Sequence, residues 1–163
     1  YLPTLFPYAG FGDSVLLILQ GNGNQGKPIC NLLGQLCSFS FDYVSRQKLG
    51  GVNMAFFIQN QLPVILPSVF ELKPFGETLK EYIKKRILEL TYTAWDLESF
   101  AKDCNYDGAP FRWDKERRFL LRTELDAAFF HLYLGSPSEW QEKGTPELLS
   151  NFPNGIHIMV TIL

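Results

Sequence analysis

Apolar residues recur at helical spacing through three long stretches of this 163-residue sequence, and this periodicity restricts the fold most strongly. Over residues 28–48 the series is Ile29, Leu32, Leu33, Leu36, Cys37 and Phe41. Over residues 77–90 it is Leu79, Ile83, Ile87 and Leu90, and over residues 114–133 it is Leu121, Leu125, Ala128, Phe129 and Leu132. We predict one helix over each range, the first beginning at Pro28 and the third capped by Asp114.

Shorter patterns lie between and beyond these helices. Residues 93–103 predict a short helix with Thr93 as its N-cap, and we expect it to bury Trp95, Leu97, Phe100 and Ala101. Two short apolar runs, over residues 15–19 and 56–58, are typical of buried strands, and the alternation over residues 156–162 is a strand signature at the end of the chain. The sequence therefore predicts an α+β fold that is predominantly helical with a few short strands.

The composition supports a real core and argues against a free-standing basic DNA-binding protein. Hydrophobic residues make up 46% of the chain, whereas the net charge is only -2. The three cysteines have no metal-binding spacing, and we interpret Cys30 and Cys37 as small buried hydrophobic residues. Reduced thiols and the lack of a signal peptide predict a cytoplasmic protein, and no apolar run is long enough to span a membrane.

Residues 38–66 change from an aromatic helix to a basic, polar end and then break at a pair of glycines. The candidate DNA-contacting residues of this stretch are Arg46, Gln47, Lys48, Gly50, Gly51 and Asn53. Arginine can read guanine and glutamine or asparagine can read adenine in the major groove, while lysine suits a phosphate. The glycines would allow the chain to reverse, including through positive φ. The alternative is a solvated helix end, where basic residues favour the helix dipole.

Two sequence blocks resemble one protein family. The first block is the motif S-F-S-F-D-Y-V-S-R-Q-K-L-G-G at residues 38–51, followed by F-F-I-Q-N-Q-L-P-V at residues 56–64. It resembles the target-recognition region of bacterial adenine-N6 DNA methyltransferases of restriction–modification systems. These are the single-chain, type IIG-like enzymes and their relatives in phage defence. The second block begins with P-F-R-W-D at residues 110–114 and ends with L-R-T-E-L-D-A-A-F-F-H-L-Y at residues 121–133. It resembles the C-terminal part of the same enzymes.

The resemblance implies a target-recognition segment over residues 1–75 and a C-terminal helical segment over residues 76–163. It implies two partners, double-stranded DNA and the N-terminal methyltransferase domain of the same protein, in which S-adenosylmethionine is expected. No cofactor is expected in this chain, because the motif of Asn or Asp followed by Pro-Pro and an aromatic residue is absent, and that motif holds the flipped adenine. The chain begins with Tyr1, and we expect it to start inside a longer polypeptide.

Residues 9–13 resemble the glycine-rich loop that holds S-adenosylmethionine, but they do not follow a strand and open a helix. Residues 20–27 are interpreted as a surface loop. The carboxylates are too scattered for a nuclease site, so we expect no catalytic residue and no metal site in this chain.

One alternative accompanies the interpretation as a DNA target-recognition fragment. The acidic balance and the aromatic helices also suit a structural docking module that packs on the methyltransferase core or on a partner subunit.

The further basic residues are Lys80, Lys84, Lys85, Arg86, Arg112, Arg117, Arg118 and Arg122. Because glutamates are interspersed among them, we predict a charge-paired, solvated face rather than a phosphate-binding surface.

Overall fold

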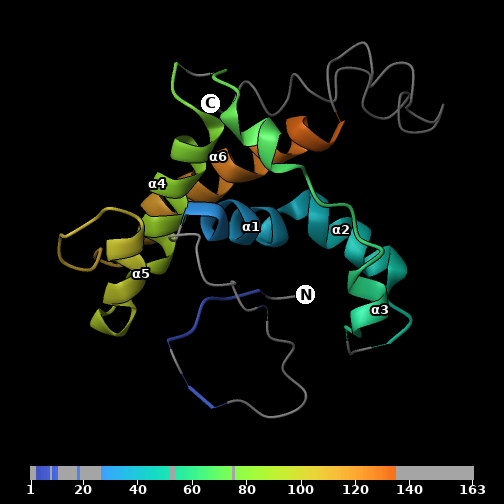
Figure 1. Cartoon of the computed structure of the whole chain (residues 1–163), viewed down its shortest axis with the longest axis horizontal. Coiled ribbons are helices and arrows are strands. Elements are labelled where there is room, and N and C mark those ends of the chain that lie inside the picture. Colours follow the sequence, from blue (N-terminus) through green and yellow to red (C-terminus); the bar gives the residue numbers. More distant parts are fainter. Residues whose placement is uncertain are drawn as a thin grey trace.

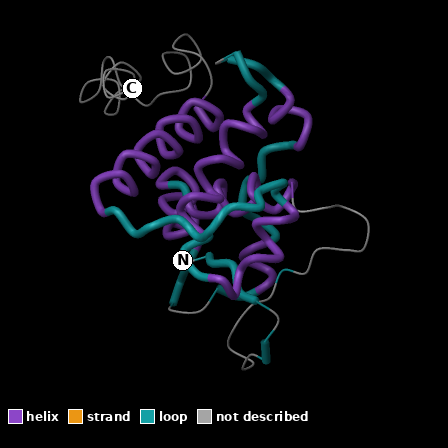
Figure 2. Tube along the Cα trace, turned by 90° about the vertical axis from the view of Figure 1, so that its left-hand side faces the viewer, coloured by secondary structure: helices purple, strands orange, loops and turns teal. Residues whose placement is uncertain are grey.

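The computed structural model describes residues 3–7, 9, 10, 18, 27–51, 54–74 and 76–134, and every regular element in these ranges is a helix (Figure 1). No strand occurs among the described residues, as the purple and teal tube of Figure 2 shows. The predicted α+β class is therefore wrong for this part of the chain, which is all-α. Two of the predicted strands, over residues 15–19 and 156–162, lie outside the described residues apart from Ile18.

The third predicted strand, over residues 56–58, is wrong because this segment begins the short helix α3 (Phe56–Gln59). Ala55 is extended, and its carbonyl accepts hydrogen bonds from the N–H groups of Ile58 at 3.0 Å and Gln59 at 3.1 Å. These local bonds satisfy backbone groups that a strand would have to pair with a neighbouring strand. With no strand beside it in the described structure, the aromatic β-propensity of the segment is overridden.

The predicted single helix over residues 28–48 is in fact two helices, α1 (Lys27–Cys37) and α2 (Phe39–Lys48). They are separated by Ser38, which has an extended backbone with ψ of 148°. The Ser38 hydroxyl donates to the Gln35 carbonyl at 2.7 Å and accepts from the Phe41 N–H at 3.3 Å. Serine is a favoured N-cap because its side chain replaces a missing helical acceptor. The break directs α2 away from the main core (Figure 1).

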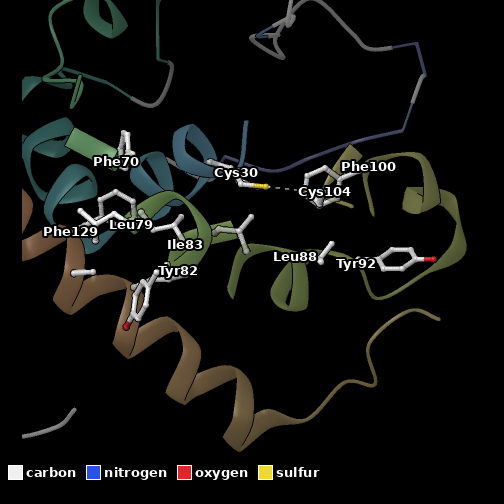
Figure 3. Packing of buried hydrophobic residues seen from close by; sticks show 14 of the residues in the cluster. Cys30, Phe70, Leu79, Tyr82, Ile83, Leu88, Tyr92, Phe100, Cys104 and Phe129 are labelled. Atoms are coloured by element: carbon white, nitrogen blue, oxygen red, sulfur yellow. Dashed lines mark hydrogen bonds between the residues drawn. The ribbon is translucent and has the colours of Figure 1, made fainter. Parts of the chain in front are cut away.

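The main core lies where α1 packs on α4 (Leu79–Thr91) and α6 (Lys115–Leu134), with α5 (Glu98–Asp103) closing one end (Figures 1 and 3). Its buried residues are Cys30, Leu33, Phe70, Leu79, Tyr82, Ile83, Ile87, Leu88, Tyr92, Phe100, Ala101, Cys104, Leu125, Ala128 and Phe129. Gly34 marks a close approach of α1, because a Cβ there would lie 3.1 Å from both Ile83 Cγ2 and Phe129 Cε2. A larger residue at this position would have to displace packed side chains.

The caps of the two long C-terminal helices follow the sequence. Asp114 accepts a hydrogen bond from the Arg117 N–H at 2.9 Å, which confirms it as the cap of α6. Helix α4 begins two residues after the predicted start, because Thr78 is its N-cap and accepts from the Glu81 N–H at 3.3 Å. The hydrophobic faces of both helices are buried largely as their periodicity predicts.

The prediction for residues 93–103 is wrong at its beginning. The 3₁₀ turn η2 (Trp95–Leu97) precedes α5, and the cap position of this turn is Ala94 rather than Thr93. Trp95, expected to be buried, is 63% exposed. The buried side of this region comes instead from Phe100 and Ala101.

The two cysteines of α1 do not share one environment. Cys30 is buried as predicted, whereas Cys37 is exposed, so the prediction of two buried thiols is wrong for Cys37. The helix ends at Cys37, beside the Ser38 break, and Cys37 is the exposed residue of a last turn whose other residues are buried. None of the helices in the described ranges combines the length and apolarity needed to cross a membrane.

Candidate nucleic-acid interface

Helix α2 is held on the molecule along one face. Its first N–H, that of Phe39, donates to Asp126 Oδ1 of α6 at 2.8 Å. Phe41 and Ser45 are buried, and the Ser45 hydroxyl donates to the Phe41 carbonyl at 2.8 Å. Phe41 packs with Leu36 and Leu62 in a second, smaller core. These contacts position the opposite face and the C-terminal end of α2 toward solvent.

The segment that follows α3 is anchored from two other helices. Gln35 of α1 is buried, and its Oε1 accepts a hydrogen bond from the Ile65 N–H at 2.9 Å. Tyr133 of α6 donates its hydroxyl to the Pro63 carbonyl at 3.1 Å, and burial raises the pKa of Tyr133 to about 12. The phenol therefore stays protonated and able to donate at physiological pH.

The sequence-predicted residues are brought together at the exposed end of α2. Arg46, Gln47 and Lys48 are all exposed in its last turn, and Gly50 and Gly51 are exposed directly after it. A Cβ added at either glycine would meet no atom within 4 Å, so the backbone there is open to a close approach. The sixth predicted residue, Asn53, lies outside the described residues.

The conformation expected of the glycine pair is wrong. Neither Gly50 nor Gly51 has a φ in the left-handed region, and the positive-φ glycine of the described chain is Gly76, at 80°. Helix α2 ends instead through Leu49, which is extended with ψ of 113° and whose N–H still donates to the Ser45 carbonyl at 3.1 Å. The chain thus leaves the helix through an extended residue, without a left-handed glycine.

The charges at this helix end include one ion pair. Arg46 Nε lies 2.7 Å from Asp42 Oδ2, one turn earlier on α2. This hydrogen bond holds the pKa of Asp42 below its usual value. The Arg46 side chain nevertheless stays 66% exposed, and exposed pairs of this kind contribute little to stability. Arg46 can therefore exchange its partner for a phosphate or a base at small cost.

Exposed aromatic side chains occur along α2 and α3. Phe39 and Tyr43 on α2 and Phe56 and Phe57 on α3 are each more than half exposed, from 58% for Tyr43 to 68% for Phe57. Helix α3 has no buried residue at all. Figure 1 shows α2 and α3 at the end of the molecule opposite α5. Clustered exposed aromatic residues are typical of surfaces that contact another molecule.

The other basic residues are engaged mainly with glutamates. The ion pairs are Lys80–Glu71, Lys84–Glu81, Lys85–Glu77, Arg86–Glu124 and Arg117–Glu89. The predicted charge pairing is therefore confirmed for these five cations, but the predicted solvation is wrong for Lys84, which is buried, and for Arg86, whose side chain is 18% exposed. Arg118 donates to the Leu90 carbonyl at 2.9 Å, and its guanidinium lies 3.8 Å from the centre of the Trp113 ring. These interactions leave the end of α2 as the better candidate for DNA contact.

Sequence reasoning missed the residues that position this surface, namely Asp126, Gln35 and Tyr133. A signal was present for Gln35, because it is a polar residue inside the apolar face of a predicted helix. No local signal connects Asp126 with Phe39, since 87 residues separate them. The described part of the chain holds no cluster of three or more potential ligands placed to bind a metal ion.

Removing the Asp126 carboxylate should loosen α2. We expect Asp126→Ala to lower the free energy of unfolding by about 1 kcal/mol, because the Phe39 N–H loses its acceptor at a helix N-terminus. Burial raises the pKa of Asp126, so the folded state disfavours its charge and the penalty grows as the pH rises through the acid range. Asp126→Asn keeps an acceptor without that penalty and should be at least as stable as the parent at pH 7. Urea unfolding of the three proteins at pH 4 and 7 tests both expectations, and equal losses in both variants would contradict them.

Comparisons of the chain with protein-family models, with curated proteins and with solved structures gave no match.

Proposed function

We propose that this chain is a DNA target-recognition fragment, in which the exposed end of α2 contacts double-stranded DNA. The observation that carries the proposal is the display of Arg46, Gln47 and Lys48 in one exposed helix turn, next to the open backbone of Gly50 and Gly51. The sequence resemblance to the recognition region of adenine-N6 DNA methyltransferases supports the same assignment. The methyl transfer itself, and S-adenosylmethionine, belong to a catalytic domain outside this chain.

Each residue of the turn has a distinct role in this proposal. Arg46 and Gln47 carry the donors and acceptors that read base edges in the major groove. Lys48 contacts a phosphate, which sets affinity without adding sequence preference. Because Gly50 and Gly51 leave open space, the DNA backbone can approach the main chain closely there. The Asp42 carboxylate opposes this binding, because it competes for Arg46 and repels phosphates.

The first test removes a cation from the proposed surface and, as a control, from a matched pair elsewhere. Lys102 and Glu98 on α5 form an exposed i,i+4 pair like Arg46 and Asp42, but at the other end of the molecule. Arg46→Gln should weaken binding to short duplexes with a randomised centre by about 5- to 100-fold and alter the sequences selected. Lys102→Gln should change neither property.

The second test uses the opposite charge change. Asp42→Asn should strengthen duplex binding several-fold at low salt, because it frees Arg46 and removes a negative charge beside the phosphates. Glu98→Gln, which removes the matching carboxylate on α5, should leave binding unchanged. If all four variants bind as the parent does, or if the two α5 variants have the same effects as the α2 variants, the proposed surface is wrong.

A second candidate function is docking on a methyltransferase core or a partner subunit. The observation that favours it is the exposure of Phe56 and Phe57 on α3, a helix with no buried residue. Under this alternative the chain binds no duplex at low salt, and Phe57→Ser abolishes association with the methyltransferase domain of the parent protein. Under the DNA proposal, duplex binding is salt-dependent and responds to Arg46→Gln.

A further inference from the structure

The fold brings together two thiols that lie far apart in the sequence. Cys30 on α1 and Cys104 at the end of α5 are 74 residues apart, and their Sγ atoms lie 3.4 Å from each other. Both residues are buried, with exposed fractions of 0% and 2%. Figure 3 shows the Cys30 sulfur directed at Cys104 within the main core. Neither thiol is paired in a disulfide in this structure.

The backbone around Cys104 is well defined by the way α5 ends. Asn105 adopts a left-handed conformation with φ of 60°, and its N–H donates to the Lys102 carbonyl at 2.9 Å. The Tyr106 N–H donates to the Ala101 carbonyl at 3.0 Å. This pair of bonds is a Schellman motif, which fixes the direction in which the chain leaves the helix. Cys104 is the C-cap residue of this motif, and its side chain is thereby held against α1.

The electrostatic surroundings make the two thiols unequal. The two thiols share one hydrogen bond that either sulfur can donate. With Cys30 as the donor, this bond lowers the pKa of Cys104, and the same bond together with burial raises the pKa of Cys30 well above its usual value. The Lys84 ammonium, which is paired with Glu81, lowers the pKa of both thiols, while Glu81 raises both and Asp103 raises that of Cys104. In the arrangement with Cys30 as the donor, Cys104 is the thiol that ionises first and the better nucleophile of the pair.

We propose that Cys30 and Cys104 form a redox-active dithiol, which small disulfides of the glutathione class convert into an intramolecular disulfide joining α1 to the end of α5. The Cys104 thiolate attacks one sulfur of the small disulfide, forming a mixed disulfide and releasing one thiolate. That thiolate takes the proton of Cys30. The Cys30 thiolate then attacks Cys104 Sγ and releases the second thiolate, which takes from the solvent the equivalent of the proton that Cys104 lost on ionising. In sum, the dithiol loses two electrons and two protons, and one small disulfide becomes two thiols.

The structure provides both the reach and the access that this reaction needs. The sulfur atoms must approach from 3.4 Å to the bond length of about 2.05 Å, a small movement compared with bridging two unrelated surface cysteines. Access comes from local opening of α5, because a six-residue helix is among the least stable elements of a fold. Cys104 lies on that helix end and is therefore exposed first, which agrees with its role as the attacking thiol.

The disulfide would fasten a weakly held element to the main core. It would close a loop that contains α2, α3, α4 and α5 in full, and this cross-link restricts the unfolded chain. Since α5 lies at the opposite end of the molecule from α2 and α3, oxidation should leave duplex binding unchanged (Figure 1). Failure of this proposal and failure of the proposed DNA function are thus separate outcomes.

The test incubates the 163-residue chain in a series of buffers with increasing ratios of oxidised to reduced glutathione. Equilibrium is approached from two sides, from the folded reduced chain and by refolding from urea in the same buffers, so that burial cannot hide the reaction. Free thiols are then blocked with iodoacetamide, and the linked peptides are identified by mass spectrometry. The expected product links the peptides of Cys30 and Cys104 by both routes, and Cys37→Ser gives the same product.

Unfolding in urea supplies an independent measurement. At the urea midpoint of the reduced chain, the unfolded fraction of the oxidised chain should be lower by about a hundredfold or more. Cys104→Ser should show no such redox-dependent shift. Recovery of both Cys30 and Cys104 as alkylated thiols by both routes would overturn the proposal, as would a cross-link that contains Cys37.

Discussion

Phe41→Ala is expected to lower the free energy of unfolding by about 3–5 kcal/mol, which is a large share of the stability of a domain of this size. The Phe41 ring is 1% exposed and is the largest side chain of the small core that it forms with Leu36 and Leu62. Alanine would leave a cavity between α1, α2 and the segment after α3. Urea unfolding monitored by circular dichroism measures the loss.

The same helix supplies a matched control. Phe39 lies two residues before Phe41 and is 61% exposed, so Phe39→Ala should change the free energy of unfolding by no more than about 0.5 kcal/mol. The backbone N–H of Phe39, which donates to Asp126, is untouched by this change. Phe41→Leu keeps most of the volume and should lose about 1–1.5 kcal/mol. Similar losses at positions 39 and 41 would contradict the assignment of the buried face of α2.

The prediction at Phe41 also concerns function. The exposed turn that carries Arg46, Gln47 and Lys48 belongs to the helix that Phe41 anchors. At a temperature where Phe41→Ala is still folded, we expect weaker duplex binding, because a loosely held α2 must be ordered again when it binds. Phe39→Ala should bind DNA within about twofold of the parent, since Phe39 is exposed and its replacement leaves the buried face of α2 intact.

Helical periodicity was a reliable guide wherever tertiary packing agrees with the local pattern. Helices α4 and α6 bury the apolar faces that the sequence indicates, and Asp114 caps α6 as predicted. The residues at which these two helices begin are also determined locally, because the Thr and Asp caps accept hydrogen bonds from N–H groups within the first turn. These features needed no knowledge of which other segment packs on the helix.

The errors arose where a local signal was weak or a non-local contact decided the structure. Ser38 breaks a helix pattern that continues on both sides of it, and a serine inside such a pattern was not interpreted as a cap. The segment at residues 56–58 has strand-forming residues, but a strand needs a partner that the described chain does not offer. Cys37 and Trp95 were expected to be buried from periodicity alone, although each lies next to a helix end.

The candidate site was predictable only in part, for the same physical reason. The exposed polar end of α2 follows from residue types at Arg46 to Lys48 and needs no tertiary information. Its support depends on Asp126 and on Gln35, whose partners lie 87 and 30 residues away. The Cys30–Cys104 contact is likewise invisible in the spacing of the three cysteines, because it is created by the docking of α5 on α1.

Glu124→Ala is the second change with a large expected effect, a loss of about 2–4 kcal/mol of unfolding free energy. Arg86 Nε of α4 lies 2.6 Å from Glu124 Oε2 of α6, and both side chains are only 18% exposed. Arg86 also donates to the Tyr82 carbonyl at 3.0 Å and lies 3.3 Å from the centre of the Tyr82 ring. These contacts would hold the guanidinium in place after Glu124 is removed, leaving a largely buried charge without its anion.

Helices α4 and α6 contain a second arginine–glutamate pair that serves as a control, with the arginine on α6 and the glutamate on α4. Arg117 of α6 pairs with Glu89 of α4 through two hydrogen bonds of 2.8 and 3.0 Å, but the Arg117 side chain is 50% exposed. Glu89→Ala should therefore cost only about 0.5–1 kcal/mol, because water solvates the remaining charge. If hydrogen-bond geometry decided the loss of stability, Glu89→Ala would cost more than Glu124→Ala, because Glu89 accepts two hydrogen bonds from Arg117. The comparison therefore separates burial from hydrogen-bond geometry as the cause.

Salt and a paired replacement complete this test. Raising the ionic strength should reduce the effect of Glu89→Ala and leave that of Glu124→Ala nearly unchanged, because mobile ions screen exposed pairs far more than buried ones. Replacing Arg86 and Glu124 together by methionine should recover most of the stability lost in Glu124→Ala, since no unpaired charge is then buried. If the double replacement is as unstable as Glu124→Ala, the loss comes from packing between α4 and α6 rather than from the uncompensated charge of Arg86.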